Sequence, residues 1–242
     1  MEQVNWSELN NLICVAAHAI YIGEDFKEPE NDENWFLQPF QKGEPPFYIE
    51  HIRRGVVLAH HDPKSLLIFS GGQTRLEAGP RSEAQSYWLI AEHYHWYGTK
   101  VKNRATTEEF ARDSFENLLF SICRFYECTK KFPDKITVVS WAFKEERFEL
   151  HRKAIKWPEE KFVFDGFNLP VDLEGAIKGE KRNAIDPFTE CPYGTEGKLK
   201  EKRIERNPFH RQHGYSISCP ELKELLDYHG REIFRGSLPW TK

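Results

Sequence analysis

The stretch Ser65-Leu66-Leu67-Ile68-Phe69-Ser70-Gly71-Gly72 decides the fold of this chain. Its four consecutive apolar residues predict a short strand that is buried on both faces. Two glycines then permit backbone angles that are closed to other residues. Further along, Ser82 and Gln85 have the spacing of a capping box at the start of a helix. A buried strand, a glycine turn and a helix form the unit with which α/β proteins hold anionic ligands, so the sequence indicates a ligand site here.

Length and composition describe a soluble globular protein. The chain has 242 residues, of which 39% are hydrophobic and 30% charged, and this balance favours a packed core over disorder. We expect one domain over residues 1–242, with a core at about 10–170 and an extension at 171–242. The net charge of −4 gives no general attraction to nucleic acid or to an anionic membrane.

Targeting and cysteine patterns point to the cytoplasm. Residues 1–8 lack the basic and apolar segments of a signal peptide, and no window approaches the ~20 apolar residues of a membrane span. The five cysteines include no CxxC pair, so we expect reduced thiols. No Cys/His cluster has the ligand spacing of a zinc site, so no metal is expected. No feature of the sequence selects an oligomeric state.

Strands alternate with helices over the first two thirds of the chain. This alternation predicts a mostly parallel sheet with helices on both faces, and the ligand of such a sheet sits at the carboxyl ends of its strands. His18, the turn at 70–72, residues 108–117 and residues 140–147 should therefore be neighbours. A short extended piece around Val101 is a further candidate strand. The predicted strands are 12–17, 65–70, 136–140 and 162–164, and the predicted helices are 45–61, 82–96, 106 or 112 to 132, and 144–155.

The chain changes character between Gly175 and about Tyr215. This segment has few aliphatic residues, and its Lys and Arg residues gather between Lys198 and Arg211. We predict an irregular excursion that returns to a C-terminal helix beginning near Ser218. The basic half of the excursion is a candidate lid over the ligand cleft or a candidate contact for a partner.

Polar groups at the predicted strand ends are the candidate ligand-binding residues. Ser70, Gly71 and Gly72 would point backbone N–H groups at an anion, with the dipole of the following helix in support. Lys144 and Arg147 are three residues apart, so they share a helix face and would clamp a phosphate or a carboxylate. The alternatives are a tight turn without a ligand and a surface helix with alternating charges.

Two further groups of residues have similar alternatives. Ser82 is a candidate ligand residue and also a simple helix cap. Residues 112–117 are dense in polar groups, but several of these are solvated if the helix begins at Thr106. Glu83 and Glu116 are the candidate catalytic carboxylates, provided that burial raises their pKa. The other candidate ligand-binding residues are Arg112, Asp113, Ser114, Asn117 and Ser140.

Together these motifs resemble the YdcF/SanA/ElyC-like domain family of bacteria. That family shows Ser-Gly-Gly after a strand, then Ser-Glu-Ala, then Glu with Ser-x-Asn-Thr-x-Glu-Asn, and a later strand that ends in Thr-Ser. The resemblance covers roughly residues 10–165 and implies a Rossmann-like three-layer α/β domain with these motifs around one cleft. It favours functional roles for Glu83, Glu116 and Asn117. The matching residues are Ser70-Gly71-Gly72, Ser82-Glu83-Ala84, Glu108, Arg112 to Asn117 and Ser140.

The chain departs from the family pattern in several places. Asp113-Ser114 stands where the family has Asn-Thr, Phe143 stands where it has His, and the Arg is displaced by one position to Arg147. Many bacterial members carry a membrane anchor, which this sequence lacks. Its tail looks like that of soluble eukaryotic, especially fungal, members. The missing His leaves the reaction open.

Three functions are consistent with these features. The first is an enzyme that acts on a phosphate-bearing or nucleotide-like small molecule held at the Ser-Gly-Gly turn. The second is S-adenosylmethionine binding, which the resemblance to YdcF suggests. The third is a non-catalytic scaffold that retains the cleft without its chemistry.

Overall fold

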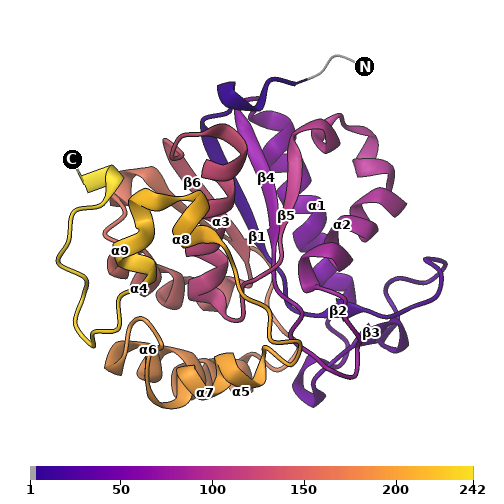
Figure 1. Ribbon diagram of the computed structural model, residues 1–242. Helices are drawn as coiled ribbons and strands as arrows, with labels where there is room; N and C mark the ends of the chain where they lie inside the picture. The colour runs from indigo at the N-terminus through magenta and orange to yellow at the C-terminus, as the bar shows by residue number, and fades with distance from the viewer. Residues whose placement is uncertain (1–3, 242) are drawn as a thin grey trace.

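A computed structural model describes residues 4–241 of the chain. At its centre is a parallel sheet of five strands in the order β5-β4-β1-β6-β7 (Figure 1). Helices cover both faces of this sheet, so the chain is the Rossmann-like three-layer α/β sandwich that its sequence predicts. The strands are β1 Asn11–Ala16, β4 Ser65–Ser70, β5 Ala105–Glu108, β6 Lys135–Ser140 and β7 Phe162–Gly166.

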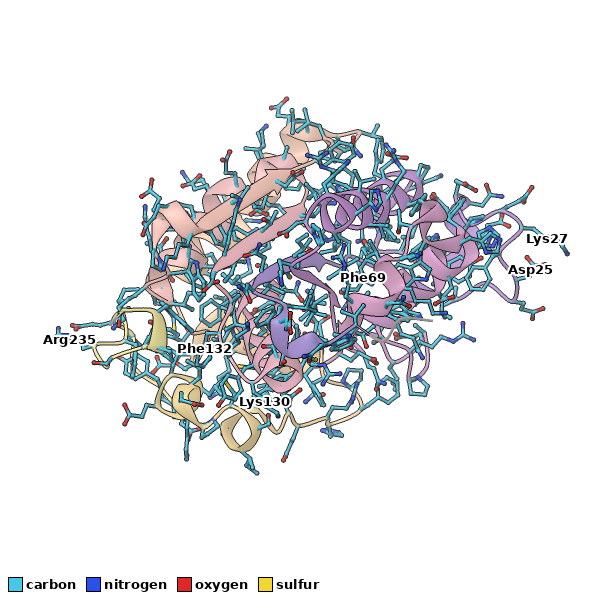
Figure 2. The ribbon with its side chains drawn as sticks, turned by 90° about the horizontal axis from the view of Figure 1, so that it is seen from above. Asp25, Lys27, Phe69, Lys130, Phe132 and Arg235 are labelled. Atoms are coloured by element: carbon cyan, nitrogen blue, oxygen red, sulfur yellow. The ribbon has the colours of Figure 1, made fainter. Side chains whose placement is uncertain are left out.

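The residues of the central strands alternate between two buried layers. Leu12 and Cys14 of β1 pack in the layer of α3 and α4, whereas Ile13 and Val15 pack in the layer of α1 and α2. Phe69 of β4 is fully buried in this second layer and lies in the interior of the molecule (Figure 2). Burial on both faces explains the continuous apolar runs in the sequence. The covering helices are α1 Pro45–His61, α2 Glu83–His93, α3 Ser114–Thr129 and α4 Glu145–Ala154.

Between α2 and α3, the strand predicted around Val101 and one of the two predicted helix starts, Thr106, are wrong, whereas the other predicted start, Arg112, lies two residues before the observed one. Residues Val101–Arg104 form a 3-10 turn, and the strand of this region, β5, begins only at Ala105. Thr106 lies in β5, so α3 does not begin there. It begins at Ser114, where the side chain of Asp113 caps the helix by accepting from the backbone N–H of Glu116.

The C-terminal extension is more helical than its sequence suggests. The segment predicted as irregular contains α5 Leu173–Glu180, a π-helical turn Lys181–Ile185, α6 Asp186–Glu190 and α7 Gly197–Glu205. These helices lie below the sheet in Figure 1, whereas α8 and α9 lie beside α3. The predicted C-terminal helix is broken into short pieces, which are α8 Tyr215–Ser218, a 3-10 turn Pro220–Leu222 and α9 Lys223–Leu226.

A small antiparallel pair of strands lies outside the main sheet. Its strands are β2 Ile20–Tyr21 and β3 Trp35–Phe36. The acidic loop between them extends away from the body of the molecule, with Asp25 and Lys27 at its exposed end (Figure 2). The acidic composition of the loop suits this exposure to solvent.

Candidate functional site

A cavity of about 660 Å³ opens at the carboxyl edge of the sheet. The chain progresses from β1 to β4 and β5 on one side, and then returns to place β6 on the other side of β1. Ligands of open parallel sheets bind where the strand order reverses in this way. His18 after β1 and Ser140 at the end of β6 both line the cavity. Residues from 170 to 184 and from α7 line its opposite wall.

Positive side chains dominate the lining of this cavity. Eight Lys or Arg residues and five Asp or Glu residues line it, which is an excess of three positive charges. Arg147 pairs with Glu180 at 2.8 Å. Within residues 4–241, by contrast, no carboxylate forms a salt bridge with Lys144, Lys202 or Arg206. The cavity therefore holds basic side chains that form no salt bridge within the described residues, although the charges of Glu180 and Glu44 act on Lys144 and that of Asp113 acts on Lys202.

Lys144 and Lys202 lie in surroundings that disfavour the charged form of a lysine side chain. Burial and the charge of Arg147 lower the pKa of Lys144 to about 7. Burial and the charges of Arg206 and Arg147 lower the pKa of Lys202 to about 7 as well. A bound anion would raise both pKa values, because its negative charge favours the protonated form of each lysine.

Glu83 is the cavity carboxyl group that is best placed for proton transfer. It lies in the first turn of α2, is 9% exposed and lines the cavity. The hydroxyl of Thr74 donates to its Oε1 at 2.6 Å. Burial raises its pKa, although the nearby charges of Arg206 and Arg75 act in the opposite direction. A carboxyl group with a raised pKa keeps its proton to higher pH, which is what a general acid requires.

His18 and Ser140 contribute polar atoms to the lining of the cavity. The Nδ1 atom of His18 lies 3.4 Å from Nζ of Lys144, and burial together with Lys144 lowers the pKa of His18. Among the residues that the structure describes, neither Nε2 of His18 nor Oγ of Ser140 has a hydrogen-bond partner. In the same part of the chain, no group of three or more His, Cys, Asp or Glu residues is arranged to bind a metal ion.

The Ser-Gly-Gly turn does not present its N–H groups to a ligand, so that prediction is wrong. The N–H of Gly71 donates to the carbonyl of Glu108 at 3.0 Å, and the N–H of Gly72 donates to that of Ala111 at 2.7 Å. The two glycine carbonyls accept from the first N–H groups of α2. Ser82 caps the same helix by accepting from the N–H of Gln85 at 2.9 Å. The turn thus joins β4, α2 and the β5–α3 connection, and its glycines do not line the cavity.

Ser70 belongs to a buried polar network behind the cavity. Its hydroxyl donates to Oε2 of Glu108 at 2.7 Å and lies 3.0 Å from Oδ1 of Asn117. Glu108 also accepts from the hydroxyl of Tyr215 at 3.1 Å. Burial raises the pKa of Glu108 to about 7. Of these residues only Asn117 lines the cavity, so Ser70 holds the sheet edge and is not a direct ligand residue.

Glu116 is engaged in ion pairs within the protein and does not line the cavity. Its Oε2 accepts from the backbone and side chain of Arg112 at 2.8 and 2.9 Å, and its Oε1 lies 3.3 Å from Nε of Arg203. The same guanidinium pairs with Asp113 at 2.6 Å. The interpretation of 112–117 as a solvated helix start is wrong, and the contacts of Glu116 are those of a structural residue.

A comparison with curated proteins gives one relative that spans nearly the whole chain. It is "Uncharacterized protein YOR238W" from Saccharomyces cerevisiae, which is 32% identical over an alignment that covers 95% of this chain and 97% of the yeast protein. The chain belongs to the family of YOR238W. No family model matches the chain, and no solved structure matches it.

In this member of the YOR238W family, most of the predicted site residues meet in one place, but not all. Lys202, Arg206, Arg75 and Glu44 also line the cavity and were not among the predicted site residues. For Lys202 and Arg206 the basic segment after Lys198 was the sequence signal, whereas no sequence pattern had marked Arg75 or Glu44. His18 was expected only as a neighbour of the site. Among the predicted residues, those that line the cavity are Glu83, Arg112, Asp113, Ser114, Asn117, Ser140, Lys144 and Arg147, and those that do not are Ser70, Gly71, Gly72, Ser82 and Glu116.

Proposed function

We propose that the protein is an enzyme that acts on a phosphate-bearing or nucleotide-like small molecule in this cavity. The observation that carries the proposal is a set of basic side chains on the walls of one cavity, Lys144, Lys202 and Arg206, that form no salt bridge within residues 4–241. A volume of about 660 Å³ is in the range of small-molecule sites. The anion is held by side chains in this proposal, not by the Ser-Gly-Gly turn.

Glu83 is the acid or base of the proposed reaction. Its carboxyl group lines the cavity, and burial raises its pKa. Glu116 is not retained in this role, because its oxygens are occupied by Arg112 and Arg203.

The other two candidate functions fit the cavity less well. S-adenosylmethionine carries a sulfonium, an ammonium and a carboxylate group, and its net positive charge does not suit a cavity that is lined by an excess of cations. A scaffold that had lost its chemistry would be expected to fill the cleft with its own side chains, and a cavity of about 660 Å³ does not fit that expectation. The resemblance to the YdcF/SanA/ElyC family remains part of the proposal.

We further propose that this reaction takes place in the cytoplasm. All five cysteines are free thiols in the structure, which suits a reducing compartment. Within residues 4–241, the structure contains no helix that is both long enough and apolar enough to span a membrane.

Thermal unfolding of the purified protein with ligands tests the proposal. The panel is ATP, glucose 6-phosphate, inorganic phosphate and S-adenosylmethionine. A ligand at 100 times its Kd stabilises a protein by about 2.7 kcal/mol, which is a shift of several degrees for a chain of this size. Lys202→Met should abolish the shift. Lys200→Met is the matched control, because Lys200 is exposed on the same helix.

The outcomes separate the candidates. A phosphate-dependent shift that is lost in Lys202→Met and kept in Lys200→Met supports the proposed site. A shift with S-adenosylmethionine alone would favour the second function, and no shift with any ligand would contradict the proposal. Once a substrate is found, Glu83→Gln should lower kcat by about 100-fold if Glu83 transfers a proton.

A further inference from the structure

Ser114 and His151 form a hydrogen-bonded pair at the wall of the cavity. The Oγ atom of Ser114, the first residue of α3, lies 2.8 Å from Nε2 of His151 on α4. Ser114 lines the cavity, whereas His151 is only 2% exposed and lies behind it. A hydroxyl next to a base at this distance is the arrangement that activates a serine nucleophile.

Aromatic packing fixes the orientation of the His151 ring. Its centroid lies 4.3 Å from that of Phe188, 5.5 Å from that of Phe148 and 5.6 Å from that of Phe115. Within the described residues, Nδ1 of His151 has no hydrogen-bond partner, so no carboxylate orients the ring. Burial and the charge of Arg147 lower the pKa of His151, which favours the neutral ring and leaves Nε2 free to accept the hydrogen bond of the Ser114 hydroxyl.

The surroundings of Ser114 suit a phosphoryl group. Lys144, Arg147 and Lys202 line the same cavity, and both Arg147 and Lys202 lie close enough to His151 to lower its pKa. Ser114 is also at the positive end of a 16-residue helix. These groups would stabilise the negative charge that gathers on phosphorus oxygens during transfer.

Resting on the function proposed above, we infer that Ser114 is a nucleophile that accepts a phosphoryl group from a phosphate ester, with His151 as its general base. The Oγ–P bond forms while the bond from phosphorus to the leaving oxygen breaks. The serine proton passes to Nε2 of His151, and the carboxyl group of Glu83, which lines the cavity, gives its proton to the leaving oxygen. Water then attacks phosphoserine and gives a proton to the Glu83 carboxylate, while the His151 imidazolium returns its proton to the Ser114 oxygen, so that the Ser114 hydroxyl is restored and inorganic phosphate is released. The net reaction is hydrolysis of the ester, with no oxidant or reductant.

The test uses the full chain with two probes, p-nitrophenyl phosphate and ATP. The reaction is quenched in acid, in which phosphoserine is stable, and the modified peptide is identified by mass spectrometry. We expect a single phosphoryl group on Ser114. Turnover should fall about 100-fold or more in Ser114→Ala and in His151→Gln.

Ser218→Ala is the matched control. The Ser218 hydroxyl also donates to an ionisable side chain, Glu127, at 2.6 Å, but it does not line the cavity. This variant should keep both the phosphoserine and the turnover. Binding of sulfate to Ser114→Ala, measured by calorimetry, should match that of the unaltered protein and so show that the cavity is intact.

Each remaining result contradicts the inference. Turnover without phosphoserine at Ser114 would contradict the assignment of Ser114 as the nucleophile. Full turnover in Ser114→Ala would contradict it as well. Sulfate binding without turnover of either probe would also overturn it, but would leave the anion site in place. If neither sulfate nor any phosphate binds, the proposed function is contradicted, and so is the assignment of Ser114 as a nucleophile, which depends on it.

Discussion

At the scale of single residues, Lys144 and Lys202 make anion binding dependent on pH. Each has a pKa of about 7 in the free protein, and the first cause in both cases is burial. A bound anion raises these pKa values, so binding takes up protons and the affinity falls as the pH rises through 7 toward 9. For sulfate, whose charge is constant in this range, Kd should increase by up to about tenfold per pH unit for each lysine. Calorimetry from pH 6 to 9 measures the slope of log Kd against pH.

The same titration identifies the lysines that are responsible. Lys202→Met should weaken sulfate binding and leave about half of the slope, since Lys144 still titrates. Lys200→Met should change neither quantity. A Kd that stays constant between pH 6 and 9 would mean that both ammonium groups are already charged in the free protein.

Single residues also show how far the sequence predicts the site. Lys144 and Arg147 were predicted to share one helix face after a strand, and both line the cavity. Arg147 is nevertheless paired with Glu180 from the extension, and Lys202 reaches the cavity from α7. Such contacts depend on how distant segments pack, and a local pattern contains no information about that.

At the scale of elements, the glycine turn between β4 and α2 is a point of close packing. A Cβ atom at Gly72 would lie 2.6 Å from the carbonyl oxygen of Ala111, and that backbone cannot move without disturbing the start of α3. Overpacking of this kind costs about 1–3 kcal/mol. Gly72→Ala should therefore lower the free energy of unfolding by that amount in a urea titration.

Gly214→Ala is the comparison for this effect. A Cβ atom at Gly214 meets no atom within 4 Å, and its φ of −99° suits an ordinary residue. The change in stability should be within about 0.5 kcal/mol. Equal stability of the two variants would show that the turn tolerates a side chain.

The elements that the sequence analysis did not predict were missed for one physical reason, which is that they lack a marked apolar pattern. β5 reads Ala-Thr-Thr-Glu and lies at an edge of the sheet, so it lacks the apolar run of the central strands. Helices α5 and α7 help to line a polar cavity, so few apolar residues mark their inner faces. The strands β1, β4 and β6 were predicted because burial on both faces demands continuous apolar residues.

At the scale of the whole molecule, the extension completes one side of the core. Phe188, Leu199 and Leu222 are buried in the same cluster as Leu12 and Ile68 of the sheet. Without residues 171–242, the outer surface of α3 and α4 would lose this cover and expose a large apolar area. The remaining chain would also lose the Tyr215 hydroxyl, which donates to the buried Glu108.

A chain that ends at residue 170 should therefore fail to fold as a unit, although it contains all five strands of the sheet. We expect it to associate on size-exclusion chromatography, to lose its near-ultraviolet circular dichroism and to bind an apolar dye, as loosely packed states do. The full chain under the same conditions is the reference. A monomeric chain of 170 residues with a cooperative urea transition would show that residues 10–170 fold alone. The extension would then serve the cavity rather than the core, and its removal should abolish sulfate binding without unfolding the sheet.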